Sequence, residues 1–177
     1  MSEKEALQQR FLKAVPAGDD RERDVCGHCG FIDYKNPKIV VGSVADFGGA
    51  ILLCRRAIEP RLGFWTLPAG YLELGETVED GARREAWEEA RARIVIDRTL
   101  AVYSVPRISQ VQIMFRARLE TPDCAAGPES LDVGLFAWDD IPWPEIAFPT
   151  VGWALRQWRE VEGRAAFPAF SNPVEGL

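Results

Sequence analysis

Histidine is nearly absent from this sequence, which contains only His28 in 177 residues. A Ser-His-Asp triad, a Cys-His pair or a metal centre with several histidines would have to include that one residue. Chemistry elsewhere in the chain must therefore depend on carboxylates, arginines, hydroxyls or thiols.

Long apolar runs and an excess of basic residues are also missing. The sequence contains no stretch of about 18 apolar residues, which is the length needed to span a bilayer. The charged segment MSEKEALQQRFLKAV does not look like a signal peptide. The net charge of −6 argues against a nucleic-acid or membrane-surface partner. An anionic small substrate stays possible, because a bound metal ion can reverse the local field. We expect a cytoplasmic protein.

Cysteine is scarce, with four residues, of which only Cys26 and Cys29 have the spacing of a motif. Without a secretory signal, a disulfide framework is not expected. The sequence also lacks internal repeats and low-complexity tracts.

The chain has strand-like segments that are interrupted by two helices of different character. Residues 1–25 predict a short helix followed by a polar loop. Strands are predicted in IVVGSVADF, AILLCRR, FWTLP, IVIDRTLAVYSV, VQIMFRARLE and DVGLFAWDD. In PTVGWALRQWREVEG, Pro149 and Gly163 mark the two ends of a helix with an apolar side formed by Val151, Leu155 and Trp158. This pattern predicts an α/β layered domain.

The other helix follows FWTLPAG and carries the acidic sequence VEDGARREAWEEAR. Thr77 and Asp80 have the spacing of a capping box, so we expect the helix to run from about Val78 to Arg91. On a helical projection, Ala82, Ala86 and Ala90 form a small apolar stripe.

Three glutamates, Glu85, Glu88 and Glu89, share one arc beside this stripe instead of lying opposite it. Partly buried carboxylates held together are unfavourable unless a cation joins them. A cluster of oxygen ligands without histidine or cysteine favours Mg²⁺ or Mn²⁺. An ordinary solvated acidic face is the alternative interpretation.

The segment also resembles the Nudix box, G-x5-E-x7-R-E-U-x-E-E-x-G-U, in which U is a bulky apolar residue. The box positions that match in register are Gly70, Glu76, Arg84, Glu85, Glu88 and Glu89. Ala86 and Ala92 are smaller than usual at U positions, and Arg91 replaces the second glycine, which puts the local backbone at the helix exit in question.

The resemblance implies the Nudix fold, an α/β/α sandwich around a mixed sheet, and hydrolysis of a nucleoside diphosphate linked to another group. It implies that Glu85, Glu88 and Glu89 bind a divalent metal, with the carbonyl of Ala69 as a further ligand. Arg84 and Glu76 would hold the helix and the preceding loop in place. A further catalytic glutamate often lies outside the box; Glu129 is the candidate, with a solvated loop acid as the alternative.

The likeness covers most of residues 15–155 and extends to a subgroup that begins with a small zinc ribbon, similar to plant FAD and ADP-ribose pyrophosphatases. We therefore expect three parts: an N-terminal helix with a degenerate ribbon-like segment (1–37), a Nudix domain (38–165) and an irregular tail (166–177). The first CxxC pair of the ribbon is replaced by KEAL at residues 4–7. Cys26 and Cys29 supply only two zinc ligands, and His28 lies between them with poor geometry, so a metal-free remnant is favoured.

The substrate implied by the subgroup is ADP-ribose or FAD, cleaved to AMP plus ribose 5-phosphate or FMN. A nucleotide-sensing module without catalysis and a nucleoside triphosphate house-cleaning enzyme are the alternatives, and a homodimer is expected from the family. Four aromatic residues are candidates for stacking on the base, namely Phe31, Tyr34, Trp65 and Tyr103. The alternative is that they are core residues, as most aromatics in such a chain are. Candidate substrate contacts are Arg55, Pro106, Arg107 and Arg116, with a strand end and surface arginines as the alternative interpretations.

Overall fold

The structure is a computed structural model that describes residues 11–174, and the chain divides after Pro37 into two units. The first unit is a three-stranded antiparallel sheet of β1 (Phe11–Ala14), β2 (Arg23–Cys26) and β3 (Ile32–Asp33). The helix predicted in this region is wrong for Phe11–Ala14, because these residues pair with β2, and Lys13 forms an ion pair with Asp24 across the two strands. The rest of that prediction, in residues 1–10, lies outside the described residues.

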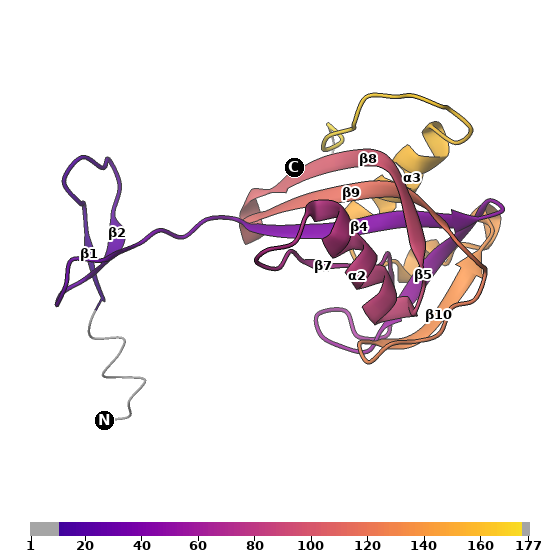
Figure 1. Cartoon of the computed structure of the whole chain (residues 1–177), viewed down its shortest axis with the longest axis horizontal. Helices are drawn as coiled ribbons and strands as arrows, with labels where there is room; N and C mark the ends of the chain where they lie inside the picture. The colour runs from indigo at the N-terminus through magenta and orange to yellow at the C-terminus, as the bar shows by residue number, and fades with distance from the viewer. Residues whose placement is uncertain (1–10, 175–177) are drawn as a thin grey trace. The chain divides into compact units, whose positions relative to one another are not determined.

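The second unit is built on a mixed seven-stranded sheet (Figure 1). Its strands are β4 (Lys38–Phe47), β5 (Ala50–Arg56), β6 (Trp65–Thr66), β7 (Ala69–Tyr71), β8 (Ile94–Val105), β9 (Gln110–Leu119) and β10 (Ser130–Phe136). The order along the sheet is β10-β5-β4-β9-β8, with β6 beside β5 and β7 beside β4. The β4–β9 pair is parallel and the other pairs are antiparallel.

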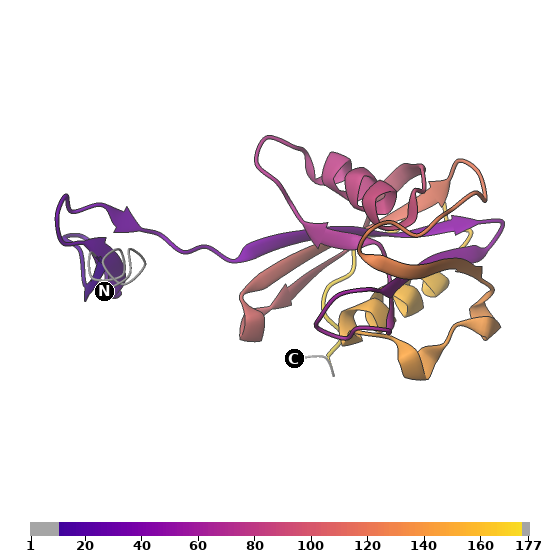
Figure 2. The same cartoon turned by 90° about the horizontal axis from the view of Figure 1, so that it is seen from below.

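Two helices cover opposite faces of this sheet, α2 (Val78–Ala90) on one and α3 (Pro149–Glu160) on the other (Figure 2). Short 3₁₀ helices, η1 (Pro106–Ile108), η2 (Trp138–Asp140) and η3 (Trp143–Glu145), lie in the connections. The predicted α/β/α sandwich is confirmed. Among the described helices, none is long and apolar enough to cross a membrane.

Strand β5 shows how the sequence is divided between the two cores. Leu52 and Cys54 pack in the cluster that contains Ala86 of α2, whereas Ile51 and Leu53 pack in the cluster of α3. All four β5 residues are buried because both faces of the strand are covered. The alternation also decides which polar residues at the end of β5 can face α2.

The tail beyond residue 165 was predicted to be irregular, but part of it pairs with the sheet. The amide of Phe170 donates to the carbonyl of Leu100 (2.8 Å), and the amide of Val102 donates to the carbonyl of Phe170 (2.9 Å). Asn172 hydrogen-bonds both backbone groups of Ser104. These residues cover part of the edge of β8, where unpaired backbone groups would otherwise be exposed.

Candidate active site

Helix α2 presents its carboxylates at the boundary between core and solvent. It begins after Thr77, whose side chain accepts a hydrogen bond from the amide of Asp80 (3.1 Å), so the predicted cap is confirmed. The alanine stripe of Ala82, Ala86 and Ala90 is fully buried, as predicted. Because they border this stripe, Glu85 and Glu89 are only 8% and 7% exposed.

The Glu89 carboxylate is buried between α2 and β7. It accepts a hydrogen bond from the amide of Ala69 (3.2 Å). Burial raises the pKa of the Glu89 carboxyl to about 8, and the negative charges of Glu85 and Glu129 add to the increase. Burial also raises the pKa of Glu85 above its ordinary value. Two carboxyl groups therefore lie together where negative charge is disfavoured.

Gly70 makes room for one of these groups. A Cβ atom at this position would lie 2.4 Å from the carboxyl atoms of Glu85, which is far inside van der Waals contact. The Glu85 carboxylate consequently rests against the backbone of β7, and only glycine permits this approach.

Arg84 links the helix to the loop that precedes it. Its guanidinium makes two hydrogen bonds to Glu76, of 3.0 and 2.7 Å, and these lower the pKa of the Glu76 carboxyl to about 2. It also donates to the carbonyl of Tyr71 (3.0 Å). A third nitrogen donates to Glu85 (2.6 Å) and Glu88 (3.1 Å). This geometry is consistent with the positioning role that the family resemblance implies for Arg84 and Glu76.

Arg84 thus supplies part of the positive charge that the acidic cluster requires. Arg84 pairs with Glu85 and Glu88, but in residues 11–174 no cationic side chain lies within ion-pair distance of Glu89. Within the same residues, no three Asp, Glu, His or Cys side chains meet closely enough to hold an ion as they stand. The donors are all carboxylates and fit a hard divalent cation, but Arg84 must first release Glu85 and Glu88.

The loop between β9 and β10 brings a fourth acidic residue to the site. The amides of Ala125 and Gly127 donate to the carbonyls of Ala90 (2.8 Å) and Glu89 (3.0 Å), so the loop caps the end of α2. Two residues later, Glu129 is exposed, and its charge contributes to the raised pKa of the Glu89 carboxyl. The catalytic role of Glu129 stays a prediction.

Arg56, which is not among the predicted site residues, lies close enough to the carboxylates for its charge to act on Glu89. It has the parity of Cys54 in β5, and its charge lowers the pKa of Glu89, while its guanidinium lies 5.2 Å from the ring centre of Phe148 at the start of α3. Its Nε atom donates to the carbonyl of Pro60 (2.8 Å). The predicted residue, Arg55, has the opposite parity and donates to the carbonyl of Gly63 (2.9 Å). The alternation of side chains along β5 distinguishes Arg56 from Arg55, but only when it is known which face of the strand α2 covers.

Arg116 does not fit its predicted role as a substrate contact. It pairs with Asp97, and one nitrogen donates to the carbonyls of Val161 (3.0 Å) and Arg164 (2.9 Å). Its guanidinium lies 4.6 Å from the ring centre of Phe167. Arg116 therefore ties the end of α3 to the sheet, on the face opposite the carboxylates.

The other substrate candidates have different environments. Pro106 and Arg107 are exposed in η1, and in the described structure neither contacts an acidic residue of the site, so their role stays a prediction. Trp65 and Tyr103 belong to the α3-side core and cannot stack on a base. Two further aromatic candidates, Phe31 and Tyr34, are exposed in the N-terminal unit.

The N-terminal unit is stabilised by ion pairs among its described residues. Asp24 bonds both Lys13 (2.8 Å) and Lys35 (2.5 Å), which lowers the pKa of the aspartate. Cys26 is half-buried and Cys29 is exposed. The KEAL segment at 4–7 lies outside the described residues, so the absence of zinc stays a prediction.

Comparison with known proteins identifies the family. A model described as NUDIX domain matches residues 35–151, two thirds of the chain, and a model described as Nudix N-terminal matches residues 9–35. This chain belongs to the Nudix family of hydrolases. The departures from the box, above all Arg91, are therefore variations within that family.

Individual relatives agree with this assignment. A MutT-like protein of Streptomyces ambofaciens is 40% identical over 79 residues, 45% of this chain and 49% of its own length. An ADP-ribose pyrophosphatase of Methanocaldococcus jannaschii is 30% identical over 119 residues, 65% of this chain and 69% of its own length. The alignment thus spans about half of the first relative. The crystal structure of a NUDIX hydrolase from Nitrosomonas europaea is 44% identical, with a TM-score of 0.85 and coverage of 91% of this chain and 93% of the other.

Proposed function

We propose that the protein hydrolyses the diphosphate bridge of a nucleoside diphosphate derivative with the help of Mg²⁺ or Mn²⁺. ADP-ribose is the first candidate substrate and FAD the second. The observation that carries this proposal is the burial of Glu85 and Glu89 side by side on α2, with the charge of Glu129 from a separate loop acting on Glu89 and the Glu89 carboxyl raised to a pKa of about 8. Such a cluster gains most from binding a cation.

The carboxylates of Glu85, Glu88 and Glu89 would hold the ion, with the Ala69 carbonyl as a further ligand. The bound ion supplies positive charge that neutralises the diphosphate and orients the attacking water. Arg84 keeps its two bonds to Glu76 while it releases the other glutamates, so the helix and its loop stay in register.

Two residues outside the box would complete the reaction. The exposed carboxylate of Glu129 accepts a proton from the water that attacks one phosphorus atom, and the bridging P–O bond then breaks. Arg56 offers a guanidinium to the phosphate oxygens beside Glu89. For ADP-ribose the products are AMP and ribose 5-phosphate, and for FAD they are AMP and FMN.

The M. jannaschii relative, which is named an ADP-ribose pyrophosphatase, supports ADP-ribose as the first substrate to test. Purified protein is incubated with ADP-ribose, FAD, NADH or nucleoside triphosphates, with Mg²⁺, Mn²⁺ or EDTA, and the products are separated by chromatography. We expect metal-dependent release of AMP from ADP-ribose or FAD. Turnover of triphosphates alone would identify a house-cleaning enzyme, and binding of ADP-ribose without turnover would identify a sensor.

Substitution within the carboxylate set tests the site itself. We expect Glu89→Gln and Glu88→Gln to lower kcat by at least about 100-fold while the protein stays folded. Glu160→Gln, which removes an exposed carboxylate from α3, is the matched control and should behave like the wild type. A wild-type rate for either α2 variant would remove that residue from the metal site. A homodimer is part of the same proposal and is tested by light scattering.

A further inference from the structure

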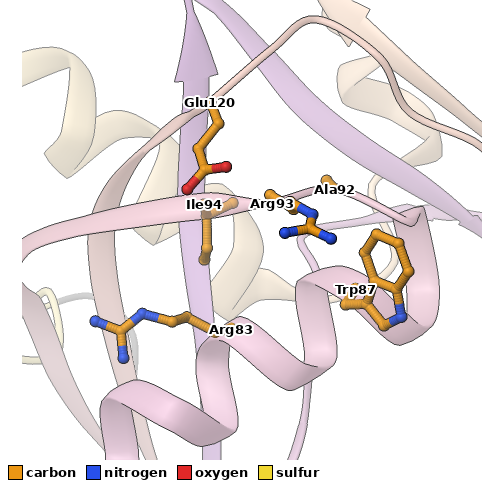
Figure 3. Close-up of a pocket in the computed structure, with 6 residues that line it drawn as sticks. All are labelled: Arg83, Trp87, Ala92, Arg93, Ile94 and Glu120. Atoms are coloured by element: carbon orange, nitrogen blue, oxygen red, sulfur yellow. The ribbon is translucent and has the colours of Figure 1, made fainter.

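A cavity of about 290 Å³ lies beside α2, on the side away from the carboxylates. Its lining residues are Arg83, Trp87, Ala92, Arg93, Ile94 and Glu120 (Figure 3). Trp87 lies about half a turn around the helix from Glu85 and Glu89. The cavity is therefore separate from the candidate active site, although one helix carries both.

Trp87 is the most unusual residue of this cavity. It is 44% exposed, and the other five tryptophans of the sequence, all described in the structure, are buried or half-buried. The guanidinium groups of Arg91 and Arg93 lie 5.7 and 5.5 Å from the centre of its ring system. Figure 3 shows the Arg93 side chain directed toward the indole. A large aromatic surface is thus held in place by cations and left open to solvent.

Arg91 occupies a backbone position that normally favours glycine. It caps α2 in the left-handed conformation, with φ 52° and ψ 22°, and the family box has glycine here. A non-glycine residue in this conformation costs roughly 1 kcal/mol. The chain therefore places a guanidinium beside Trp87 at the expense of local stability.

The cavity carries an excess of positive charge in a chain that is negative overall. Of the two lining arginines, Arg93 has no ion-pair partner among the described residues and Arg83 pairs only with Asp80 (2.8 Å); Arg91, which lies beside Trp87 outside the lining, has no ion-pair partner there either. That pair is exposed on one helix and is weak, so Arg83 is available to a ligand. Glu120 is the one acidic residue of the lining.

We propose that this cavity binds a free mononucleotide whose base stacks on Trp87 and whose phosphate is bound by the arginines. Guanidinium groups are suited to phosphate oxygens, and an indole with neighbouring arginines is suited to a heterocyclic base. The Glu120 carboxylate can accept a hydrogen bond from an exocyclic amino group, which favours adenine and the other amino-bearing bases over uracil. The volume lies at the lower end of ligand pockets and fits a mononucleotide better than a dinucleotide.

Calorimetric titration of the full chain with AMP in EDTA tests the proposal without turnover. EDTA removes the ions that would join a phosphate to the active-site carboxylates, so the result does not depend on the proposed hydrolysis. We expect AMP to bind and Trp87→Ala and Arg93→Gln each to weaken its binding by about tenfold or more. The control is Arg159→Gln, which removes a guanidinium that lies 5.5 Å from the ring centre of Trp138 near the other helix.

Three further measurements define the ligand and the role of Arg91. Inorganic phosphate alone should bind more weakly than AMP, and UMP should bind more weakly than AMP because uracil has no exocyclic amino group to donate to Glu120. Arg91→Gly should raise the melting temperature by a few degrees, because it relieves the left-handed arginine, and should weaken AMP binding.

The proposal is overturned if millimolar AMP does not bind in EDTA. It is equally overturned if Trp87→Ala and Arg93→Gln bind AMP with wild-type affinity, since the ligand would then occupy another site. Phosphate that binds as tightly as AMP would contradict a role for the base. An Arg91→Gly variant that is more stable and keeps full AMP affinity would exclude Arg91 from the site.

Discussion

Substitution of Gly127 by alanine gives the sharpest test of how the β9–β10 loop serves the site. A Cβ atom on Gly127 would lie 1.6 Å from the carbonyl oxygen of Glu88, and real Cβ atoms essentially never come within 3.0 Å of such an atom. The loop or the end of α2 must therefore move by more than about 1 Å. A displacement of that size in a catalytic group can lower a rate by about 100-fold.

The same movement breaks the hydrogen bonds by which the loop caps α2. The amides of Ala125 and Gly127 would lose the carbonyls of Ala90 and Glu89. Together with the steric overlap, we expect a loss of about 2–4 kcal/mol in the free energy of unfolding. Urea unfolding measures this loss, and steady-state kinetics with the preferred substrate measures kcat.

Two comparisons make the Gly127 experiment decisive. Gly152→Ala, in α3, is the control, because its Cβ meets only the flexible end of the Arg156 side chain at 3.2 Å and alanine favours a helix. If the loop acts by placing Glu129, then Gly127→Ala and Glu129→Gln each lower kcat and their effects do not add. A folded Gly127→Ala protein with wild-type kcat and stability would refute the reasoning.

Three other substitutions test separate parts of the site. We expect Mg²⁺ to raise the melting temperature of the wild type and Gly70→Ala to abolish this rise, because its Cβ would lie 2.4 Å from the carboxyl of Glu85; an equal rise in both proteins would contradict this. The pKa of Glu89 is about 8 in the folded protein and 4.5 in the unfolded chain, so the free energy of unfolding in EDTA should fall by about 3 kcal/mol between pH 5.5 and 8. Urea unfolding measures this pH dependence, and Glu89→Gln should make it weaker. Arg84→Lys should lower kcat and melting temperature, because lysine cannot make the two bonds to Glu76, whereas wild-type values would assign Arg84 no positioning role.

The parts of the structure that follow from local signals could be predicted from the sequence. The span of α2 followed from Thr77 and the alanine stripe, and α3 followed from Pro149 and its apolar side. The burial of Glu85 and Glu89 followed from the angle between them and the stripe, without knowledge of the fold.

The parts that depend on tertiary pairing could not be predicted in this way. Phe11–Ala14 forms a strand because it pairs with β2. Phe170, in the tail that was predicted to be irregular, pairs with Ala101 of β8. The choice between Arg55 and Arg56 depends on which face of β5 the helix covers. Arg116 looked free in the sequence, but its donors are used by carbonyl groups at the end of α3, which is distant in sequence.

Two different interactions stabilise the crowded glutamates of α2, and a bound metal ion would have to replace both. Arg84 neutralises Glu85 and Glu88 from within the helix, whereas Glu89 is out of its reach and is stabilised instead by its proton and the Ala69 amide. A divalent ion would take over both functions. The fixed part of the site is then the bond between Arg84 and Glu76, which does not depend on the ion, and the carboxylates beyond it are the part that rearranges.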